Sequence, residues 1–201
     1  MIAIIDYDAG NIRSVEKALE SLGADYRLTR DCAEIAGADK VILPGVGAFG
    51  DAMKRLNEYG LVDVIHRVVD RGTPFLGICL GLQVMFDSSE ESPGVKGLSL
   101  LPGEVVRFSG ADGLKVPQIG WNSLSVKSGS RLLKGIYSGS FVYFVHSYYV
   151  NATDKNDVIA TASYGETADV AVEHNNIFGC QFHPEKSSSI GIKILNNFVN
   201  L

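Results

Sequence analysis

The chain holds few cysteines, and they stand far apart. Cys32, Cys79 and Cys180 are an odd number at wide spacing, and no two of them form a CxxC pair. Neither a disulfide framework nor a structural zinc site fits this pattern. We therefore predict no metal, and we expect a reducing compartment, the cytoplasm.

Long apolar runs and a basic excess are missing as well. The sequence has no unbroken apolar stretch of about 18 residues, the least that a membrane-spanning helix needs. Its first residues lack the positively charged region of a signal peptide. The formal net charge is -5, so the chain offers no basic field to nucleic acid or anionic lipid. We expect a soluble globular protein that binds neither.

What is present is an ordinary globular composition. The 201 residues are 46% hydrophobic and 20% charged, without a repeat, a low-complexity tract or a Pro/Ser-rich linker. This length is enough to bury one sizeable core. We predict a single domain over residues 1–201.

The first half alternates short apolar runs with amphipathic ones. "IAII" and "KVILPG" predict strands, and between them apolar residues recur at helical spacing, at Ile12, Val15, Leu19 and Leu22. A second helical stripe over residues 61–69 ends near Gly72, and "TPFLGI" follows as a buried strand. This order is typical of βαβ units. It predicts an α/β fold with a flavodoxin-like, doubly wound and mostly parallel sheet.

From about residue 95 the pattern changes to Gly-rich, β-prone segments. "FVYFVHSYYV" and "VIATASY" are examples, and in "DVAVEHNNIFGCQFH" a His-Asn-Asn turn separates two alternating runs. Such segments predict additional antiparallel strands in the C-terminal half. A closing helix is indicated by the spacing of Ile190, Ile194, Leu195 and Phe198.

One cysteine is distinguished by its neighbours. In "GICLG", Gly77 and Gly81 flank Cys79 between a buried strand and a run of helical pattern. This spacing is typical of the sharp turn that holds a nucleophile at the carboxyl edge of a parallel sheet. The dipole and free N–H groups of the following helix would favour the thiolate, and the N–H of Leu80 is a natural oxyanion donor. The alternative is a buried structural cysteine, a common role of free cysteine.

A thiolate nucleophile needs an imidazole base, and the base needs a group that orients it. "FHPE" supplies both, because His183 follows a predicted strand and Glu185 stands two residues later, beyond a rigid proline. His66 and His174 lie in polar surroundings and are expected to be solvated. His146, in an apolar strand, remains a second candidate base.

A glycine-rich segment, "PGVGAFGD", follows the second strand. It contains neither GxxxxGK[ST] nor GxGxxG, so the sequence does not favour a nucleotide site. Its backbone N–H groups, at Val46 or Gly47, are candidates for the second oxyanion donor near Cys79. Plain turn chemistry is the alternative. We expect Asp51 to cap the helix that follows.

These segments resemble a known family, the class I, triad-type glutamine amidotransferases. The family's elbow cysteine matches "GICLGLQ", and its HPE motif matches "FHPE". The order of further segments is similar to one branch, the glutaminase subunits of a two-subunit enzyme of histidine biosynthesis, over nearly the whole chain: "DYDAGNIRSV", "LPGVGAFGDAM", "PGVKGLSLLPG", "VPQIGWN", "FVHSYYV" and "QFHPEKSS". One departure is Gln118-Ile119, where the branch is expected to have His-Met.

The resemblance implies a reaction. Cys79 would attack the side-chain amide of glutamine, release ammonia and form a γ-glutamyl thioester that water resolves to glutamate. His183 would be the general base and then the general acid, and Glu185 would orient it. Glutamine would be held by Gln83 and by the backbone of Gly47, Ser147 and Tyr148. The resemblance implies no cofactor.

It also implies a partner. The ammonia would pass to a separate (β/α)8-barrel cyclase subunit, forming a heterodimer that makes imidazole glycerol phosphate and an aminoimidazole-carboxamide ribotide. We expect Trp121, Asn122, Lys186 and Asn11 at the interface. The alternatives are a core tryptophan, a solvated lysine and a helix N-cap at Asn11.

Val46 suggests how such a partner would control the site. If its N–H must face the oxyanion, we expect the peptide to need a conformation that a β-branched residue resists and glycine would accept. We hypothesise that the oxyanion hole is unformed in the free chain and that the ligand-loaded cyclase forms it.

Other functions fit the same residues. The chain could be the glutaminase of a different amination pathway, or a cysteine peptidase on the same fold. A catalytically inactive, flavodoxin-type binding module is the third possibility, although "DYDAGN" lacks the Ser/Thr cluster that would hold a flavin phosphate.

Overall fold

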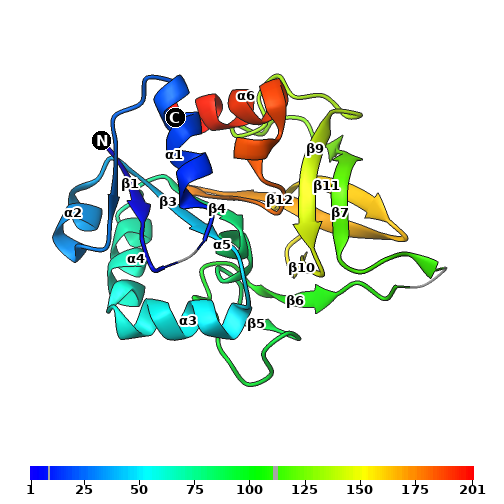
Figure 1. Cartoon of the computed structure of the whole chain (residues 1–201), viewed down its shortest axis with the longest axis horizontal. Helices are drawn as coiled ribbons and strands as arrows, with labels where there is room; N and C mark the ends of the chain where they lie inside the picture. The colour runs from blue at the N-terminus through cyan, green and yellow to red at the C-terminus, as the bar shows by residue number, and fades with distance from the viewer. Residues whose placement is uncertain (9, 111–112) are drawn as a thin grey trace.

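The computed structural model describes residues 1–8, 10–110 and 113–201. Figure 1 shows the elements in chain order. They are β1 (Ile2–Ile5), α1 (Ile12–Ser21), β2 (Tyr26–Thr29), α2 (Cys32–Gly37), β3 (Lys40–Gly45), α3 (Phe49–Glu58), α4 (Leu61–Asp70), β4 (Phe75–Cys79), α5 (Leu80–Gln83), β5 (Ser88–Ser89), β6 (Gly103–Arg107), β7 (Gln118–Ser123), β8 (Ser125–Val126), β9 (Phe141–His146), β10 (Tyr148–Ala152), β11 (Val158–Tyr164), β12 (Glu166–His174), β13 (Ile177–Cys180), the 3-10 turn η2 (Pro184–Lys186) and α6 (Ser188–Val199).

The four strands of the first half, together with β13 from near the C-terminus, form the parallel part of the sheet, in the order β2, β1, β3, β4 and β13. All neighbouring pairs in this part are parallel. The strand β4 is buried throughout, as the apolar run predicts. Parallel strands need covering on both faces, which explains why these runs are apolar without alternation.

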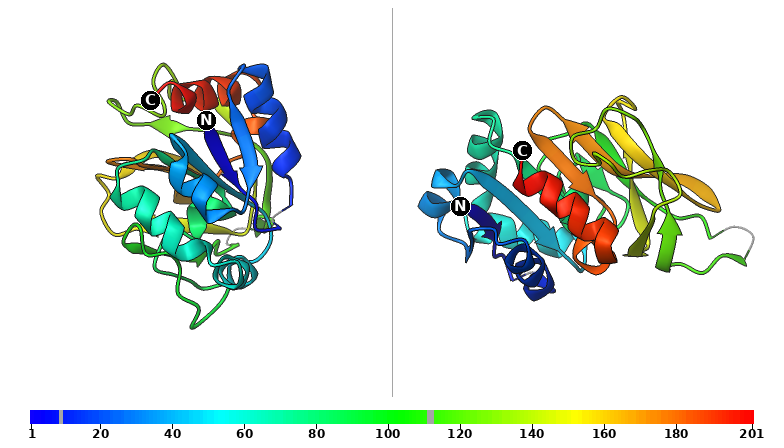
Figure 2. Two further views of the ribbon diagram at one scale, coloured as in Figure 1. Left: turned by 90° about the vertical axis from the view of Figure 1, so that its left-hand side faces the viewer. Right: turned by 90° about the horizontal axis from the view of Figure 1, so that it is seen from above.

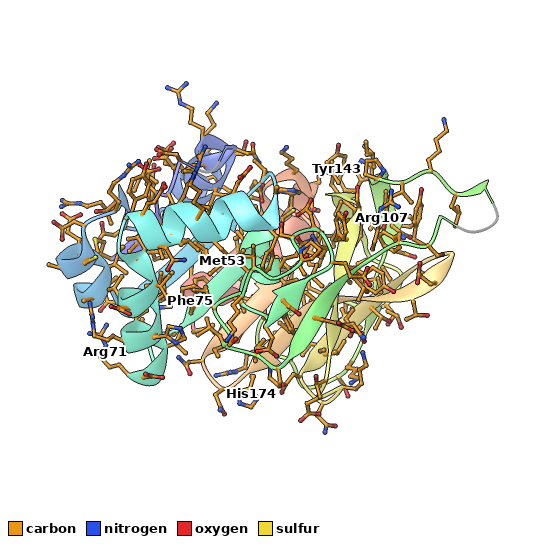
Figure 3. All side chains as sticks on the ribbon, turned by 90° about the horizontal axis from the view of Figure 1, so that it is seen from below. Met53, Arg71, Phe75, Arg107, Tyr143 and His174 are labelled. Atoms are coloured by element: carbon orange, nitrogen blue, oxygen red, sulfur yellow. The ribbon has the colours of Figure 1, made fainter. Side chains whose placement is uncertain are left out.

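Helices cover both faces of this sheet (Figures 1 and 2). Residues of α1 and α6 share one buried cluster with one face of the strands. Residues of α2, α3 and α4 share a second cluster with the opposite face, where Figure 3 shows Met53 of α3 and Phe75 of β4. The flavodoxin-like, doubly wound arrangement predicted from the sequence is confirmed. In the described part of the chain, no helix is both long and apolar enough to span a membrane.

Antiparallel strands extend the sheet in the second half, as predicted. β12 pairs with β13 across the two-residue turn Asn175–Asn176, and β10 and β6 continue outward. The segment "FVYFVHSYYV" does not form one strand. It divides at Ser147, because β9 pairs with β7 in a separate two-stranded sheet whereas β10 pairs with the main sheet. The division leaves Ser147 at the junction of the two sheets.

The start of α3 differs from the prediction. The helix begins at Phe49, so Asp51 lies within its first turn and does not cap it. Instead, the N–H groups of Phe49 and Gly50 donate to the side chains of Glu91 and Ser92, at 2.8 Å and 3.0 Å. A segment forty residues away therefore satisfies the free N–H groups that a helix leaves at its start.

The turn after β4 depends on two very close approaches. A Cβ on Gly81 would lie 1.8 Å from the carbonyl oxygen of Leu43, and a Cβ on Gly77 would lie 2.6 Å from the carbonyl oxygen of Gly81. Real Cβ atoms do not approach backbone oxygens so closely, so the two glycines allow α5 to fold back onto β3 and β4. The predicted strand-to-helix elbow is confirmed, together with the reason for its flanking glycines.

We expect Gly81→Ala to destabilise the fold by about 3 kcal/mol or more, because the added methyl group meets backbone that cannot move without shifting β3. The measurement is the free energy of unfolding in urea. Gly37→Ala is the matched control, since a Cβ there meets nothing within 4 Å, and it should change stability by less than about 1 kcal/mol. Equal effects of the two substitutions would contradict this account of the elbow.

Candidate active site

Cys79 ends β4 in a strained conformation. Its φ is 54° and its ψ is -110°, which non-glycine residues rarely adopt. The helix that follows is shorter than the sequence suggests, because α5 contains only Leu80–Gln83. A single turn sums few peptide dipoles, so the expected contribution of a helix dipole is weaker than predicted. The N–H groups of that first turn, including that of Leu80, still lie directly after Cys79.

His183 reaches Cys79 because β13 lies beside β4 in parallel. Cys180 pairs with Ile78 in this register, and the chain continues past the strand to His183. The N–H of His183 donates to the carbonyl of Tyr143 at 3.0 Å, which fixes the backbone there. Residues more than a hundred positions apart are thereby brought to one edge of the sheet.

Glu185 is the carboxylate that contacts the imidazole. His183 Nδ1 lies 2.7 Å from Glu185 Oε1, and both side chains are almost completely buried. The turn η2 places them together, since the N–H of Lys186 donates to the carbonyl of His183 at 3.0 Å. This contact fixes the ring and leaves Nε2 for the sulfur side, as a base with an orienting group requires.

The charge of His183 is set by opposing effects. Burial lowers its pKa, but the hydrogen-bonding interactions with Cys79 and Glu185 outweigh burial and raise the pKa to about 10. Among the described residues, no atom makes a hydrogen bond of good geometry with Nε2, so its interaction with the Cys79 sulfur is a loose one. Catalytic hydrogen bonds commonly tighten when substrate binds.

Asn11 contacts the triad carboxylate directly. Its Nδ2 donates to Glu185 Oε1 at 3.0 Å, and its Oδ1 accepts from Ser14 Oγ at the same distance. Asn11 occupies the N-cap position of α1 in a left-handed conformation, but its side chain makes no capping hydrogen bond. From the sequence, Asn11 was expected either to cap the helix or to contact the partner. Its hydrogen bond to Glu185 was not predicted.

Two glutamines connect Cys79 to the backbone of Tyr148, at the start of β10. Gln181, which the sequence analysis missed, donates to Cys79 Sγ at 3.6 Å. Gln83 donates to Gln181 Oε1 at 3.0 Å and to the carbonyl of Tyr148 at 2.9 Å. A polar residue in the buried run "IFGCQF" was the available signal for Gln181. The network fixes the sulfur relative to the segment after Ser147.

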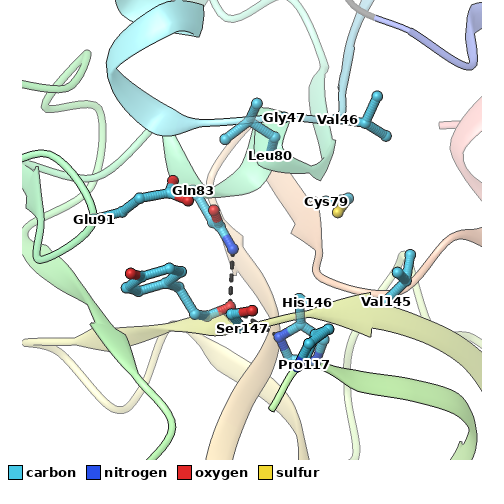
Figure 4. A pocket seen from close by; sticks show the side chains of 11 residues that line it. Val46, Gly47, Cys79, Leu80, Gln83, Glu91, Pro117, Val145, His146 and Ser147 are labelled. Atoms are coloured by element: carbon cyan, nitrogen blue, oxygen red, sulfur yellow. Dashed lines mark hydrogen bonds between the residues drawn. The ribbon is translucent and has the colours of Figure 1, made fainter.

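A cavity of about 290 Å³ opens beside Cys79, a size near the lower end of small-molecule sites. Figure 4 shows most of its lining, which consists of Val46, Gly47, Cys79, Leu80, Gln83, Glu91, Pro117, Val145, His146, Ser147 and Tyr148. Every residue predicted for the oxyanion hole or for glutamine lies in this set. Glu91 does not come from the sequence analysis, because nothing in "SSEESPG" indicates that it faces a cavity.

His146 also lines the cavity, but in a different electrostatic state from His183. Burial and, to a smaller extent, the nearby His183 lower its pKa to about 4, against a hydrogen bond to the Tyr148 carbonyl that raises it. That bond, 2.8 Å from Nδ1, identifies Nδ1 as the protonated nitrogen, because a carbonyl only accepts. The ring is therefore neutral and has no carboxylate partner among the described residues.

The glycine-rich segment approaches the sulfur through the strand pairing of β3 with β4. Gly45 pairs with Cys79, so Val46 and Gly47 emerge at the same edge. Gly47 has a φ of 109°, whereas a Cβ there would meet nothing within 4 Å. Glycine is needed at this position for backbone conformation and not for space.

The residues predicted for a partner interface divide between two environments. Trp121 is 53% exposed and its ring stands edge-on to that of Tyr143, so it is not a core residue. Lys186 is exposed. Asn122 points to the other face of β7, where its Nδ2 donates to the carbonyl of Ser163 at 2.9 Å.

In the departure from the expected pattern, Gln118 is buried opposite His146, whereas Ile119 is 64% exposed. The substitution therefore changes one residue of the interior and one of the surface. The catalytic contacts of Cys79 and Glu185 are unaffected, because neither residue touches them.

The comparison with family models decides what these residues belong to. The model described as "Glutamine amidotransferase class-I" matches residues 3–201. The chain belongs to the class I glutamine amidotransferases. The family predicted from the motifs is confirmed.

Curated relatives and solved structures agree with this assignment. The imidazole glycerol phosphate synthase subunit HisH of Syntrophotalea carbinolica is 51% identical, covering 98% of both chains. The subunit of the same name from Methanocaldococcus jannaschii is 46% identical over 100% of both. A crystal structure of a glutamine amidotransferase has a TM-score of 0.77 at 21% identity, covering 100% of both chains. PurLQS from Thermotoga maritima has a TM-score of 0.76 at 20% identity, covering 99% of this chain and 97% of that one. At these identities, the two structures are similar in fold alone.

The interaction between sulfur and imidazole gives a pH prediction. Because the pKa of His183 is raised above its ordinary value, the contacts of the protonated ring stabilise the fold fully below about pH 6.5 and lose this effect as the pH approaches about 10. Cys79→Ser should lower the pKa of His183, because the interaction with the sulfur that raises this pKa is lost while burial still lowers it. NMR titration of the labelled imidazole measures it. Cys32→Ser, at a remote thiol, is the control, and an equal pKa in both variants would refute the Cys79 contribution.

Proposed function

We propose that the chain is the glutaminase subunit of an imidazole glycerol phosphate synthase, in histidine biosynthesis. The observation that carries the proposal is that Cys79, which lines the small cavity, interacts with His183, whose ring contacts Glu185. Relatives that share about half of its residues over nearly their whole length have the corresponding name. The family match over residues 3–201 supports a single domain, and three free cysteines are consistent with the cytoplasm.

The proposed reaction uses the geometry in two stages. The Cys79 thiolate attacks the carboxamide carbon of glutamine, and protonated His183 gives its proton to the departing nitrogen, so ammonia leaves and a thioester remains. His183, now neutral, then takes a proton from water as the water attacks the thioester. Glutamate and the thiolate are released, and Glu185 keeps the ring oriented throughout.

The cavity lining suggests how glutamine is held. Glu91 is a carboxylate at the cavity wall whose Oε2 accepts the N–H of Phe49, which keeps the side chain in place. We assign it to the α-ammonium group of glutamine, since a fixed carboxylate pairs with a cation. Gln83 and the backbone of Gly47, Ser147 and Tyr148 complete the contacts.

The strand register supports a closed oxyanion hole in the free chain. The N–H of Val41 donates to the carbonyl of Pro74 next to β4, and alternate residues of a strand direct their N–H and C=O groups to the same neighbour. The carbonyl of Gly45 accordingly faces β4, and the N–H of Val46, on the other side of the same peptide, faces away. Oxyanion stabilisation at Cys79 needs the reverse orientation, so we propose that this peptide turns when the partner binds.

The proposed docking surface for the cyclase is one face of the two-stranded sheet. Cross-strand pairing places its members on one side, with Ile119, Trp121 and Phe141 exposed by 53–64%. We call this the β7–β9 face; it consists of Ile119, Trp121, Phe141, Tyr143 and Val145. Val145 also lines the catalytic cavity, so a partner on this face would sit at the site mouth. Contiguous exposed apolar residues of this kind mark interaction sites.

The alternative is a glutaminase of another amination pathway, because the fold and cavity do not define which molecule receives ammonia. We prefer a (β/α)8-barrel cyclase as the acceptor of the ammonia, because the relatives named above are subunits of imidazole glycerol phosphate synthase. A peptidase is disfavoured by the small, partly enclosed cavity, which leaves little room for a peptide chain on both sides of Cys79.

We expect the chain mixed with its candidate cyclase and the cyclase's nucleotide to convert glutamine to glutamate, with much less turnover in the chain alone. Cys79→Ala should reduce the coupled rate by roughly a thousandfold or more, because it removes the nucleophile. Glutamate release is the measurement. Cys32→Ala should retain the parent rate.

Two outcomes would contradict the proposal. Full activity of Cys79→Ala would reject the nucleophile. High turnover without the partner would reject the closed oxyanion hole but leave the glutaminase assignment intact.

Trp121→Ala should weaken binding to the cyclase at least about tenfold if the β7–β9 face is the interface. Unchanged affinity would show that the interface lies elsewhere.

A further inference from the structure

Tyr7 carries a buried hydroxyl that the proposed chemistry does not use. The side chain is 1% exposed, and its hydroxyl has no hydrogen-bond partner in the described part of the chain. Burial raises the pKa of Tyr7 far above its ordinary value, and the nearby Cys79 raises it further. The group is therefore a neutral O–H donor close to the reacting sulfur. An unmatched buried donor costs free energy unless another state of the molecule provides its acceptor.

The hydroxyl lies against the segment that forms the oxyanion hole. A Cβ built on Gly45 would be 2.2 Å from the Tyr7 oxygen, so the oxygen touches the Gly45 Cα region. In the sheet, β3 stands between β1 and β4. Tyr7 follows β1, so its ring reaches Gly45 from the β1 side, and its hydroxyl lies over the same face of Gly45 as the Leu80 side chain, which follows Cys79.

Space exists on both sides of this segment. The catalytic cavity of about 290 Å³ touches Val46 and Gly47. A second cavity of about 160 Å³ touches the same two residues and also Tyr7. In the described part of the chain, no backbone hydrogen bond outside the strand ladders involves Val46 or Gly47. Gly45 pairs with Cys79 in the ladder, so turning the Gly45–Val46 peptide removes the contact of the Gly45 carbonyl with β4, and the turned carbonyl needs a new donor.

Tyr7 itself is held in place. The next residue, Asp8, pairs with Arg30 at 2.7 Å, and its carbonyl accepts a hydrogen bond from Arg55 of α3. Tyr59 also donates to the Asp8 carboxylate. The residue that would receive a turned carbonyl is therefore anchored to α3, whereas among the described residues Val46 and Gly47 have no backbone hydrogen bond outside the strand ladders.

We propose that Tyr7 is a positioning residue whose hydroxyl donates a hydrogen bond to the carbonyl of Gly45 when the Gly45–Val46 peptide turns its N–H toward Cys79. This rests on the proposed glutaminase function and its turning peptide. Turning directs the Gly45 carbonyl away from β4 and toward the side where Tyr7 lies. The hydrogen bond exists only in the turned state, so it raises the fraction of chains with a formed oxyanion hole.

The test is Tyr7→Phe in the complex with the candidate cyclase and its nucleotide. We expect kcat for glutamate release to fall about 3- to 10-fold, the effect of one ordinary hydrogen bond. KM for glutamine should stay within about twofold, because Tyr7 does not line the catalytic cavity. The melting temperature of the free chain should be unchanged or higher, since phenylalanine keeps the ring and removes an unmatched group.

A second readout separates Tyr7 from the sulfur. Alkylation of Cys79 by iodoacetamide requires the thiolate but no oxyanion hole, so its rate should equal that of the parent. Tyr26→Phe is the matched control. Tyr26 lies on the distant strand β2 and donates a hydrogen bond of 2.7 Å to Glu20 of α1. The substitution removes this bond and should leave kcat unchanged.

Three results would overturn the proposal: an unchanged kcat in Tyr7→Phe, a loss of stability that accounts for the loss of activity, or alkylation slowed in proportion to kcat. Failure of the proposed function is distinguishable, because the parent complex would then release no glutamate. That outcome would remove the Tyr7 proposal as well.

Discussion

The packing of Gly81 onto the backbone of Leu43 is the constraint on which the site depends. It forces the chain to reverse direction immediately after β4, and Cys79 has to occupy the positive-φ conformation at that bend. Because β4 lies between β3 and β13 in a parallel sheet, each neighbour delivers its own segment to the same edge. One side supplies Val46 and the other supplies His183. The positions of the proposed nucleophile, its proposed base and the proposed oxyanion donors thus follow from one bend and one strand order.

The loop after β1 connects the two halves of this arrangement. Through Asn11 it contacts Glu185, which orients the imidazole. Through Tyr7 it contacts Gly45, which begins the oxyanion segment. The ion pairs of Arg30 with Asp6 and Asp8 hold the start of this loop at the end of β2, and Arg55 of α3 donates to the carbonyl of Asp8. A displacement of the loop would reach the acid–base pair and the oxyanion donors together, so it is a suitable element for coupling to a partner.

Local pattern was sufficient for much of the fold and for the triad. Apolar runs and helical stripes predict the parallel strands and their helices because each has its own period along the sequence. The GxCxG spacing predicts the elbow because the close approaches involve residues adjacent in sequence. His183 and Glu185 are found for a similar reason, since they lie two residues apart.

Contacts between distant segments left no such signal. The N–H groups at the start of α3 are satisfied by Glu91 and Ser92, which no pattern near Asp51 indicates. The division of one β-prone run at Ser147 depends on which sheet offers a free edge to each part. The short length of α5 follows from tertiary packing, although "LGLQVMF" suggests a longer helix. The roles of Asn11 and Tyr7 likewise appear only when the loop after β1 is placed against β3 and η2.

The central claim is that the sulfur at this bend forms a covalent bond with the carboxamide carbon of glutamine. Rapid acid quenching of the complex during turnover, followed by peptide mass spectrometry, tests it most directly. The account predicts a mass increase of one γ-glutamyl group on the peptide that contains Cys79, discharged by hydroxylamine. An adduct on Cys32 or Cys180, or active turnover with no adduct on any cysteine at every quench time, would contradict it.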